Sequence, residues 1–433
     1  MNVAIVGFGV EGKSAFDYWH KLGAVITICD RNTEAAIPEG AASQLGEGYA
    51  DGLDKFDIVV RSAGIPPKEL LGHTPGIESK MTTVVDEFLR VCPTKNTIGV
   101  TGTKGKGTTS TLITNMLEAA GKKVYLAGNI GRSPLDFLEE LTPDDWVVLE
   151  FSSFQLSDIH HSPHIALSLM IVPEHLNWHD DFDDYVGAKS HIFTYQTADD
   201  IAVYYPENEA SSKNGKLSKG TQIPYFAAPG ALVQGNEIII GDQVICKTSE
   251  LKLLGKHNWQ NVCAALTVVW QATQDVAAMR SVLTTFSGLP YRLELIRELD
   301  GVRYYNDSLG TTPETTIGAI EAFKEPKVMI VGGASKGVQF DDMAKATVAP
   351  DANVRTIVLI GDMAPTIEAA LKNVGFTSFI HGGETMATAV VAAHDAAQSG
   401  DVVLLAPGCS SFDMFKDYKD RGDQFNDAVN QLQ

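Results

Sequence analysis

Short apolar runs that end in glycine or in a polar residue recur along the whole chain and limit its fold more than any other feature. Examples are NVAIVGFG, AVITICD, TIGVTG, DWVVLEFSS, KVMIVGG and DVVLLAPG. Runs without polar alternation suit strands that are buried on both faces, as in parallel sheets. Helical patterns lie between the runs, and Leu112, Ile113, Met116 and Leu117 share one helical face. The sequence therefore predicts an α/β chain with parallel sheets.

Three stretches of the chain are expected to form separate domains. VCPTKN supplies a Pro-containing linker after the first stretch, and the second ends near Gly288, just before LPYR. We predict domains at residues 1–92, 93–288 and 289–433. A chain of 433 residues has room for them, at about 150 residues per domain.

The charge and the cysteines limit the partners and the compartment. The chain has 34 basic and 54 acidic residues, a formal net charge of −20, which disfavours nucleic acid and anionic membranes as partners. The five cysteines show no CxxC spacing, so we expect neither a disulfide framework nor a zinc site. Neither a signal peptide nor an apolar run of about 20 residues is recognised. We expect a cytoplasmic protein that acts as a monomer.

The segment TIGVTGTKGKGTTSTLI is the strongest local signal for a ligand. A buried strand, a glycine-rich loop, a lysine and a helix follow one another as in a nucleotide-binding loop, where glycines let backbone N–H groups point at phosphate oxygens. The predicted ATP-binding residues are Gly102, Thr103, Lys104, Gly105, Lys106, Gly107, Thr108 and Thr109. Gly107 stands where a serine or threonine usually binds Mg²⁺, so Thr108 or Thr109 is expected to supply that oxygen.

Three further side chains of the same stretch are candidates for the site. Glu150 ends the run DWVVLE, and ligands collect at the carboxyl ends of parallel strands, so this carboxylate can hold the Mg²⁺ that accompanies ATP. His175 lies in PEHLNWH, and Lys189 lies in DYVGAKSHIF. A lone histidine or lysine is more often structural than functional. The combination HLNWH…Y…AK favours a functional interpretation of both residues.

Taken in order, these motifs resemble those of the Mur ligase family, above all the members that join glutamate to UDP-N-acetylmuramoyl-L-alanine. The matching motifs span essentially the whole chain: VGFGVEGKS, RSAGIPP, TGTKGKGTT, AGNIG, LEFSSFQL, PEHLNWH, YVGAK, LLGKHNWQNVCAA, LPYRLE, GVRYYNDS, GGASKG and APGCSSFDMFKDYKDRGDQF. The resemblance implies a Rossmann-like N-terminal domain for the UDP substrate, a central ATPase domain with a P-loop type of parallel sheet, and a Rossmann-like C-terminal domain for the amino acid. It also implies a role in peptidoglycan synthesis, and so in cell wall biogenesis, cell shape and cell division.

The resemblance implies roles for individual residues. It redirects the glycine fingerprint of VGFGVEGKS from NAD to UDP. The implied contacts to the UDP moiety are Gly12, Ser14, Asp30, Arg31, Ser62 and Gly64, and those to the muramoyl moiety are Asn129, Ser152 and Gln155. It implies adenine contacts by Asn258 and Asn261, further nucleotide contacts by Arg292 and Asp307, and catalytic roles for Lys106, His175 and Lys189. Two Mg²⁺ ions are implied, the first on Glu150 and the second on His175 and a carbamoylated Lys189. Of the two loop threonines, we expect Thr108 to bind the first ion.

The implied reaction is ATP-dependent amide ligation. The substrate carboxylate takes the γ-phosphoryl group of ATP, and the amine of the amino acid attacks the resulting acyl phosphate. The implied amino-acid contacts are Thr311, Lys336, Ser411, Phe412 and Tyr418. Leu309 and Ala334 depart from the family, which commonly has lysine and aspartate there. We therefore expect glutamate, with D-glutamate favoured and the sibling ligases that add L-glutamate as the alternative.

Three other functions are compatible with parts of the sequence. Folylpolyglutamate synthase shares the phosphate loop, but those enzymes generally begin with the ATPase domain and lack a domain like VGFGVEGKS. A non-catalytic nucleotide-binding protein descended from a ligase is disfavoured because Lys106, Glu150, His175 and Lys189 are retained. An NAD oxidoreductase has no need of the central phosphate loop.

Overall fold

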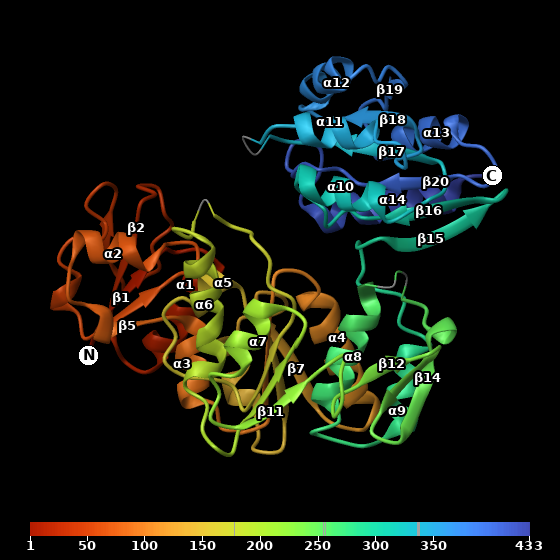
Figure 1. The fold of residues 1–433 in the computed structure, drawn as a ribbon. Coiled ribbons are helices and arrows are strands. Elements are labelled where there is room, and N and C mark those ends of the chain that lie inside the picture. The colour runs from red at the N-terminus through yellow and green to blue at the C-terminus, as the bar shows by residue number, and fades with distance from the viewer. Residues whose placement is uncertain (177, 254, 256, 336–337) are drawn as a thin grey trace. The chain divides into compact units, whose positions relative to one another are not determined.

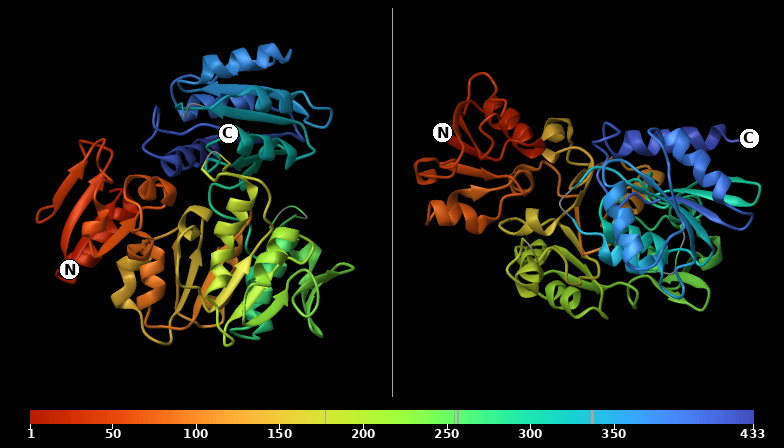
Figure 2. Two further views of the ribbon diagram at one scale, coloured as in Figure 1. Left: turned by 60° about the vertical axis from the view of Figure 1, so that its left-hand side comes forward. Right: turned by 90° about the horizontal axis from the view of Figure 1, so that it is seen from above.

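The computed structural model describes residues 1–176, 178–253, 255, 257–335 and 338–433. They form two compact units, Met1–Phe286 and Ser287–Gln433. Each unit has helices packed on mainly parallel sheets (Figure 1, Figure 2), which confirms the predicted α/β class. The first unit holds two large sheets, and the domain boundaries predicted at residues 92 and 288 stay predictions. Among the described residues, no helix combines the length and the apolar character needed to cross a membrane.

The N-terminal sheet is five-stranded and parallel, with the order β3-β2-β1-β4-β5. Its strands are β1 (Asn2–Val6), β2 (Val25–Asp30), β3 (Ala42–Leu45), β4 (Ile58–Arg61) and β5 (Met81–Thr82). Its helices are α1 (Val10–Lys21), α2 (Pro67–His73) and α3 (Val84–Val91), with 3-10 turns at Leu53–Lys55 and Glu78–Lys80. Because β1 lies between β2 and β4, its carboxyl end is the switch point at which such sheets bind ligands.

The central sheet is six-stranded and parallel, with the order β11-β10-β9-β6-β8-β7. Its strands are β6 (Thr97–Thr101), β7 (Val124–Gly128), β8 (Trp146–Glu150), β9 (Ile165–Ser168), β10 (Ile201–Tyr204) and β11 (Thr221–Pro224). Because β6 pairs with both β8 and β9, the loop that follows β6 lies at the same edge as Glu150.

Helices cover the central sheet, and a small antiparallel sheet follows it. The helices are α4 (Lys106–Ala119), α5 (Ser153–Leu156), α6 (Phe182–Thr194), α7 (Glu209–Gly215), α8 (His257–Val269) and α9 (Val276–Leu283), with 3-10 segments at Pro134–Glu140 and Thr248–Glu250. The small sheet comprises β12 (Leu232–Gln234), β13 (Glu237–Ile240) and β14 (Gln243–Lys247). The predicted apolar face of α4 is confirmed, since Leu112, Ile113, Met116 and Leu117 are fully buried.

The second unit has a six-stranded sheet with the order β15-β16-β20-β17-β18-β19, in which only the β15–β16 pair is antiparallel. Its strands are β15 (Glu294–Leu299), β16 (Val302–Asn306), β17 (Lys327–Gly332), β18 (Val354–Ile360), β19 (Phe379–His381) and β20 (Val402–Leu405). Its helices are α10 (Pro313–Glu321), α11 (Asp341–Thr347), α12 (Ala364–Asn373), α13 (Met386–Ala396) and α14 (Tyr418–Gln431). Because Asn306 pairs with Leu405, the segments after β16 and β20 meet at one edge.

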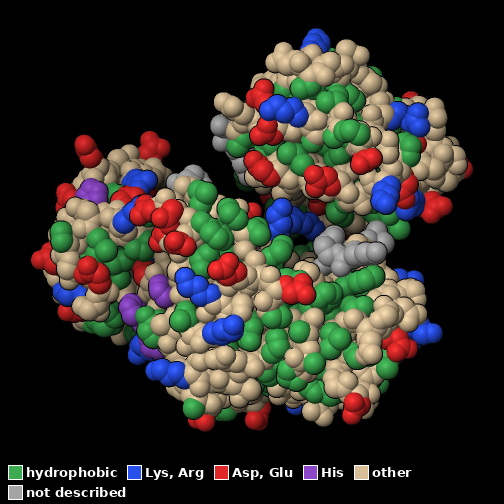
Figure 3. All heavy atoms as spheres, viewed as in Figure 1, with side chains coloured by type: hydrophobic (Ala, Val, Ile, Leu, Met, Phe, Trp, Pro, Cys, Tyr) green, Lys and Arg blue, Asp and Glu red, His purple; other side chains and the backbone are tan. Residues whose placement is uncertain are grey.

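Acidic and basic side chains are interspersed on the face drawn in Figure 3, within a chain whose formal net charge is −20.

Candidate active site

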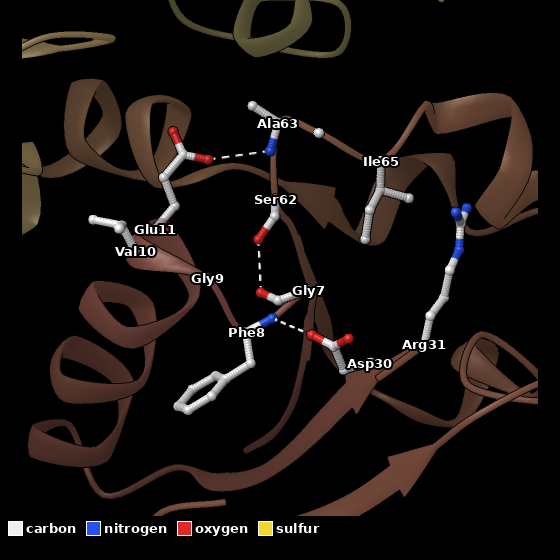
Figure 4. A pocket seen from close by; sticks show the side chains of 11 residues that line it. Gly7, Phe8, Gly9, Val10, Glu11, Asp30, Arg31, Ser62, Ala63 and Ile65 are labelled. Carbon is white, nitrogen blue, oxygen red and sulfur yellow. Dashed lines mark hydrogen bonds between the residues drawn. The ribbon is translucent and has the colours of Figure 1, made fainter. Parts of the chain in front are cut away.

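Two adjoining cavities of the first unit lie at the carboxyl ends of its two large sheets. The first, of about 440 Å³, is lined by Gly7, Phe8, Gly9, Val10, Glu11, Asp30, Arg31, Ser62, Ala63, Gly64 and Ile65 (Figure 4). The second, of about 300 Å³, is lined by Val10, Glu11, Ala63, Gly128, Asn129, Gly131, Ser133, Pro134, Ser152, Phe154 and Gln155. Val10, Glu11 and Ala63 belong to both, so one extended ligand can reach from one cavity into the other.

The first cavity is built on the tight turn that joins β1 to α1. Gly7 has a φ of +89°, and a Cβ on it would lie 2.9 Å from Ser62 Cβ. A Cβ on Gly12 would lie 2.2 Å from Gly7 O, so Gly12 lets the helix pack against the turn. Phe8 N donates to Asp30 Oδ2 (2.7 Å), and Ser62 Oγ donates to Gly7 O (2.7 Å), as Figure 4 shows.

Four of the six residues predicted for the UDP moiety line this cavity: Asp30, Arg31, Ser62 and Gly64. Gly12 and Ser14 are not among its lining residues. Gly12 packs on the turn instead, and Ser14 is buried in α1 with a hydroxyl that has no partner among the described residues.

All three residues predicted for the muramoyl moiety line the second cavity. Asn129 Nδ2 donates to Glu150 Oε1 (2.8 Å). Ser152 caps α5, where its hydroxyl accepts a bond from Gln155 N (3.2 Å). These side chains therefore lie between the N-terminal cavity and the strand end that carries Glu150.

Glu11 joins the two cavities and was not predicted from the sequence. Its Oε2 accepts a bond from Ala63 N (3.1 Å), and its Oε1 accepts one from Gln155 Nε2 (2.8 Å). The only sequence signal is a charged residue inside a glycine fingerprint, and that signal gives no indication of partners so distant in the sequence.

The loop between β6 and α4 has the close packing that its glycines permit. Gly102 and Gly105 have φ values of +143° and +87°. Cβ atoms on them would lie 2.6 Å from Leu169 Cβ and 2.3 Å from Asn261 Oδ1. Lys106 Nζ donates to Gly102 O (3.1 Å) and Thr103 O (2.9 Å), so its charge lies over the loop. Backbone N–H groups at the start of α4 and this ammonium group suit a polyphosphate.

The other predicted loop residues differ in exposure, and the two asparagines lie beside them. Lys104 is exposed, Gly107 and Thr108 are half-buried, and Thr103 and Thr109 are buried. Asn261 packs on Gly105, and its Nδ2 donates to Asn258 Oδ1 (2.8 Å) at the start of α8. The structure thus places both predicted adenine contacts next to the loop.

Buried oxygens beside the loop fit Mg²⁺. Glu150 is 3% exposed, and its Oε2 has no hydrogen-bond partner among the described residues. Thr109 Oγ1 is likewise buried without a partner among the described residues. Of the two candidate loop threonines, Thr108 and Thr109, Thr109 therefore carries the unsatisfied oxygen. Buried oxygens normally have partners, and Mg²⁺ prefers oxygen ligands. The described residues contain no cluster of three His, Cys, Asp or Glu side chains, so a complete site needs hydroxyl, carbamate or phosphate oxygens too.

Lys189 and His175 lie near the same loop with their neutral forms favoured. Lys189 is 1% exposed, and its Nζ donates to Gly102 O (3.0 Å). Burial, then the charge of Lys106, holds the Lys189 pKa well below its usual range. Burial also lowers the His175 pKa, although Glu174 opposes it. A neutral amine is the form that reacts with CO₂, and neutral imidazole is the form that binds metals.

The second histidine of PEHLNWH is structural. His179 has a fully buried side chain whose Nδ1 lies 2.9 Å from Asp184 Oδ2 and whose Nε2 lies 3.0 Å from Ser153 Oγ. It therefore joins α5 to α6 and holds Ser153 beside the cavity residue Ser152.

In the second unit, the residues predicted for the amino acid lie around the segments after β16 and β20. Gly408 N donates to Gly310 O (3.2 Å), which joins the segment after β20 to the segment after β16. Ser411 is buried, Tyr418 is half-buried and Phe412 is 74% exposed. Lys336 lies outside the described residues.

Arg421 organises this part of the second unit and was not predicted from the sequence. It is fully buried, and burial lowers its pKa to about 10. Its Nε donates to Ser308 Oγ (3.0 Å), and its Nη1 donates to Cys409 O (3.0 Å). Ser308 Oγ in turn donates to Tyr418 O (2.7 Å). One guanidinium group thus joins the NDS turn, the backbone at Cys409 and the start of α14.

Asp307, for which a nucleotide contact is predicted, is a buried carboxylate at this edge of the sheet. It accepts a bond from Leu293 N (3.1 Å), and Arg292, which is exposed, lies close enough to oppose the effect of burial. Burial dominates and raises the Asp307 pKa from 3.8 to about 7.

Replacing Asp307 with asparagine is expected to stabilise the second unit above neutral pH. Between pH 3.8, the Asp307 pKa in the unfolded state, and about pH 7, its pKa in the folded state, the folded protein holds a proton on Asp307 that the unfolded protein has lost. Raising the pH removes this proton and so destabilises the fold. We expect Asp307→Asn to raise the free energy of unfolding by about 3 kcal/mol near pH 8 and to change it little near pH 4. Urea unfolding at both pH values measures this. An equal change at the two values would contradict the assignment.

Comparison with known proteins places this geometry in a family. Residues 100–269 match the Mur ligase middle domain, and residues 291–409 match the Mur ligase, glutamate ligase domain. The chain is 36% identical over 453 residues to the UDP-N-acetylmuramoylalanine–D-glutamate ligase of Clostridium kluyveri, with 100% of this chain and 97% of that protein covered.

Solved structures are similar in fold at lower identity. One is the MurF ligase of Thermotoga maritima in complex with ADP, with a TM-score of 0.58 and 18% identity over 99% of this chain and 94% of that chain. Another is FolC of E. coli in complex with DHPP and ADP, with a TM-score of 0.58 and 19% identity over 86% of this chain and 100% of that chain.

Proposed function

Because this chain belongs to the Mur ligase family, we propose that it is the ATP-dependent ligase that adds D-glutamate to UDP-N-acetylmuramoyl-L-alanine in peptidoglycan precursor synthesis. The observation that carries the proposal is the pair of adjoining cavities, which runs from the β1 switch point to the strand end at Glu150. A substrate with a nucleotide at one end and a carboxylate at the other fits that arrangement.

The first cavity receives the UDP moiety and the second receives the muramoyl group. Ser62 and Gly64 face the nucleotide, while Asn129 and Gln155 hold the sugar and its lactoyl-alanine arm. The terminal carboxylate of the arm then points towards the loop at Lys106. Binding at the distant UDP end orients the reacting carboxylate. This lowers the activation barrier, because the translational and rotational entropy of the reacting groups is lost on binding and not in the chemical step.

The reaction has two steps. A carboxylate oxygen attacks the γ-phosphorus of ATP, ADP leaves, and a mixed acyl phosphate forms. The ammonium group of D-glutamate loses one proton to become a free amine, which attacks the acyl carbon. Phosphate leaves with the electrons of the broken C–O bond, and the nitrogen releases a second proton as the amide forms. Lys106 stabilises the charge that moves onto the phosphoryl oxygens in the first step.

The chain provides ligands for the Mg²⁺ that accompanies ATP. We assign one ion to Glu150 with a hydroxyl of the loop, Thr108 or Thr109, and a second to His175 with a carbamoylated Lys189. The orphaned oxygens of Glu150 and Thr109, and the lowered pKa of Lys189, support this assignment. When bound, such ions neutralise phosphate charge.

D-glutamate is favoured over the alternatives by the full-length relatives. The name of the Clostridium kluyveri protein, at 36% identity, specifies D-glutamate, whereas FolC is similar only in fold, at 19% identity. In the second unit Thr311, Ser411, Phe412 and Tyr418, with Lys336, bind the amino acid. Leu309 replaces a family lysine, so Thr311, Lys336 and Ser411 carry the carboxylate recognition that this lysine would share. We place the enzyme in the cytoplasm as a monomer.

Transfer of an isotope tests the acyl-phosphate route. We expect substrate labelled with oxygen-18 in the alanine carboxylate to deliver one labelled oxygen to the released phosphate, because that oxygen bridges carbon and phosphorus in the intermediate. Mass spectrometry of the phosphate measures it. Unlabelled phosphate released together with amide product would exclude this route.

A further inference from the structure

Arg61, the last residue of β4, lies fully buried between the two cavities. Its Nε donates to Asp158 Oδ2 (2.8 Å), and its Nη2 donates to the other oxygen of that carboxylate. Asp158 follows α5 by two residues. The bidentate pair therefore ties the N-terminal sheet to the segment that lines the second cavity.

The rest of the guanidinium group fixes backbone on both sides of this junction. Nη1 donates to three carbonyls of the segment after β4, those of Ser62 (3.2 Å), Ala63 (3.3 Å) and Ile65 (2.7 Å). All three residues line the first cavity. Nη2 also donates to the carbonyl of Phe154 (2.8 Å), a lining residue of the second. One side chain thus contacts the walls of both cavities without lining either.

Glu11 makes an independent link across the same junction. It accepts bonds from Ala63 N on one side and Gln155 Nε2 on the other. The segment at residues 62–65 is consequently held to α5 from two directions, by a buried cation and by a carboxylate at the cavity surface.

We propose that Arg61 is a positioning residue that sets the spacing between the two cavities, so that one UDP-muramoyl substrate fills both at once. The inference rests on the proposed function, since it needs a substrate with two joined parts. A ligand that occupies two subsites gains affinity from the second only when the distance between the subsites matches the ligand. A ligand that occupies one subsite does not sense that distance.

Arg61→Lys separates these two kinds of binding. Lysine keeps the charge but offers one nitrogen, which cannot span the Asp158 carboxylate, the 62–65 carbonyls and Phe154 O together. By calorimetry, we expect the Kd for UDP to stay within about twofold and the Kd for UDP-N-acetylmuramoyl-L-alanine to rise about tenfold or more. The KM for ATP should not change, because the Arg61 hydrogen bonds among the described residues go to Asp158, to Phe154 and to the 62–65 segment and none goes to the phosphate loop.

Two further variants make the test decisive. Asp158→Asn keeps the shape of the partner and weakens only the bidentate pair, so it should shift the same ratio in the same direction, by less. Arg90→Lys is the matched control, because Arg90 is half-exposed, pairs with Glu87 and lines neither cavity.

Three results would overturn the inference. They are equal weakening of UDP and of the whole substrate, no weakening of the whole substrate, or an equal effect in Arg90→Lys. If Arg61→Lys does not fold, the same comparison in Asp158→Asn decides. A wild-type protein that binds neither UDP nor the whole substrate would instead overturn the proposed function on which the inference rests.

Discussion

Replacing Lys106 with methionine is expected to lower kcat/KM for ATP about a thousandfold, a loss of about 4 kcal/mol of transition-state stabilisation. The Lys106 ammonium group lies over the loop, 3.1 Å from Gly102 O and 2.9 Å from Thr103 O, at the N-terminus of α4. Methionine keeps an unbranched apolar chain of similar length but removes the charge that balances the phosphoryl oxygens. Phosphate release measured against ATP concentration gives the ratio.

The matched control is Lys122→Met, an exposed lysine just beyond the other end of α4. It removes the same charge from the same neighbourhood of the chain without touching the loop, and we expect wild-type kinetics. A loss of less than about tenfold in Lys106→Met would mean that Lys106 does not stabilise the transferring phosphoryl group.

Replacing Lys189 with methionine is expected to abolish turnover while it stabilises the fold. The Lys189 amine is buried beside Gly102 O, and burial holds its pKa well below the usual range. We expect activity to fall about a thousandfold or more, because the carbamate proposed on this amine would be lost. Wild-type activity should in addition fall in buffer freed of CO₂ and return when bicarbonate is added.

The stability effect of Lys189→Met has a defined sign. A lysine whose pKa is lower in the folded state than in the unfolded state binds fewer protons when the protein is folded. It therefore destabilises the fold at pH values below its pKa in the unfolded state, and this cost fades as the pH rises towards about 10. In CO₂-free buffer we therefore expect Lys189→Met to be more stable than wild type near neutral pH, with a gain that shrinks in alkali.

Lys327→Met is the matched control for a buried lysine, since burial also lowers the Lys327 pKa and its amine donates to Ala352 O in the second unit. It should keep activity. Full activity of Lys189→Met, or a wild type indifferent to CO₂, would contradict the role proposed for Lys189.

Local features of the site were predictable from the sequence because they depend on neighbouring residues. A buried strand, glycines with positive φ and an amphipathic helix are contiguous in TIGVTGTKGKGTTSTLI, so the positions of Gly102, Gly105 and Lys106 follow from short-range rules. Glu150 followed from the rule that parallel strands end at one edge.

Features that depend on distant pairs were not predictable. Glu11 meets Gln155 across 144 positions, and Arg61 meets Asp158 across 97, so no local pattern marks either pair. Arg421 is similar, because its partner Ser308 lies 113 positions away. Gly12 shows the opposite difficulty. The first cavity lies at its fingerprint, but Gly12 itself packs the helix on the turn and is not a lining residue of the cavity.

Product formation with each enantiomer of glutamate tests the central claim most directly. Purified protein is incubated with UDP-N-acetylmuramoyl-L-alanine, ATP and Mg²⁺, with D-glutamate or L-glutamate in parallel, and the products are identified by mass. We predict a product heavier by one glutamyl residue, with ADP and phosphate, from D-glutamate alone. Turnover with L-glutamate alone would contradict the assigned specificity, and no product from either, in protein that binds ATP, would contradict the function itself.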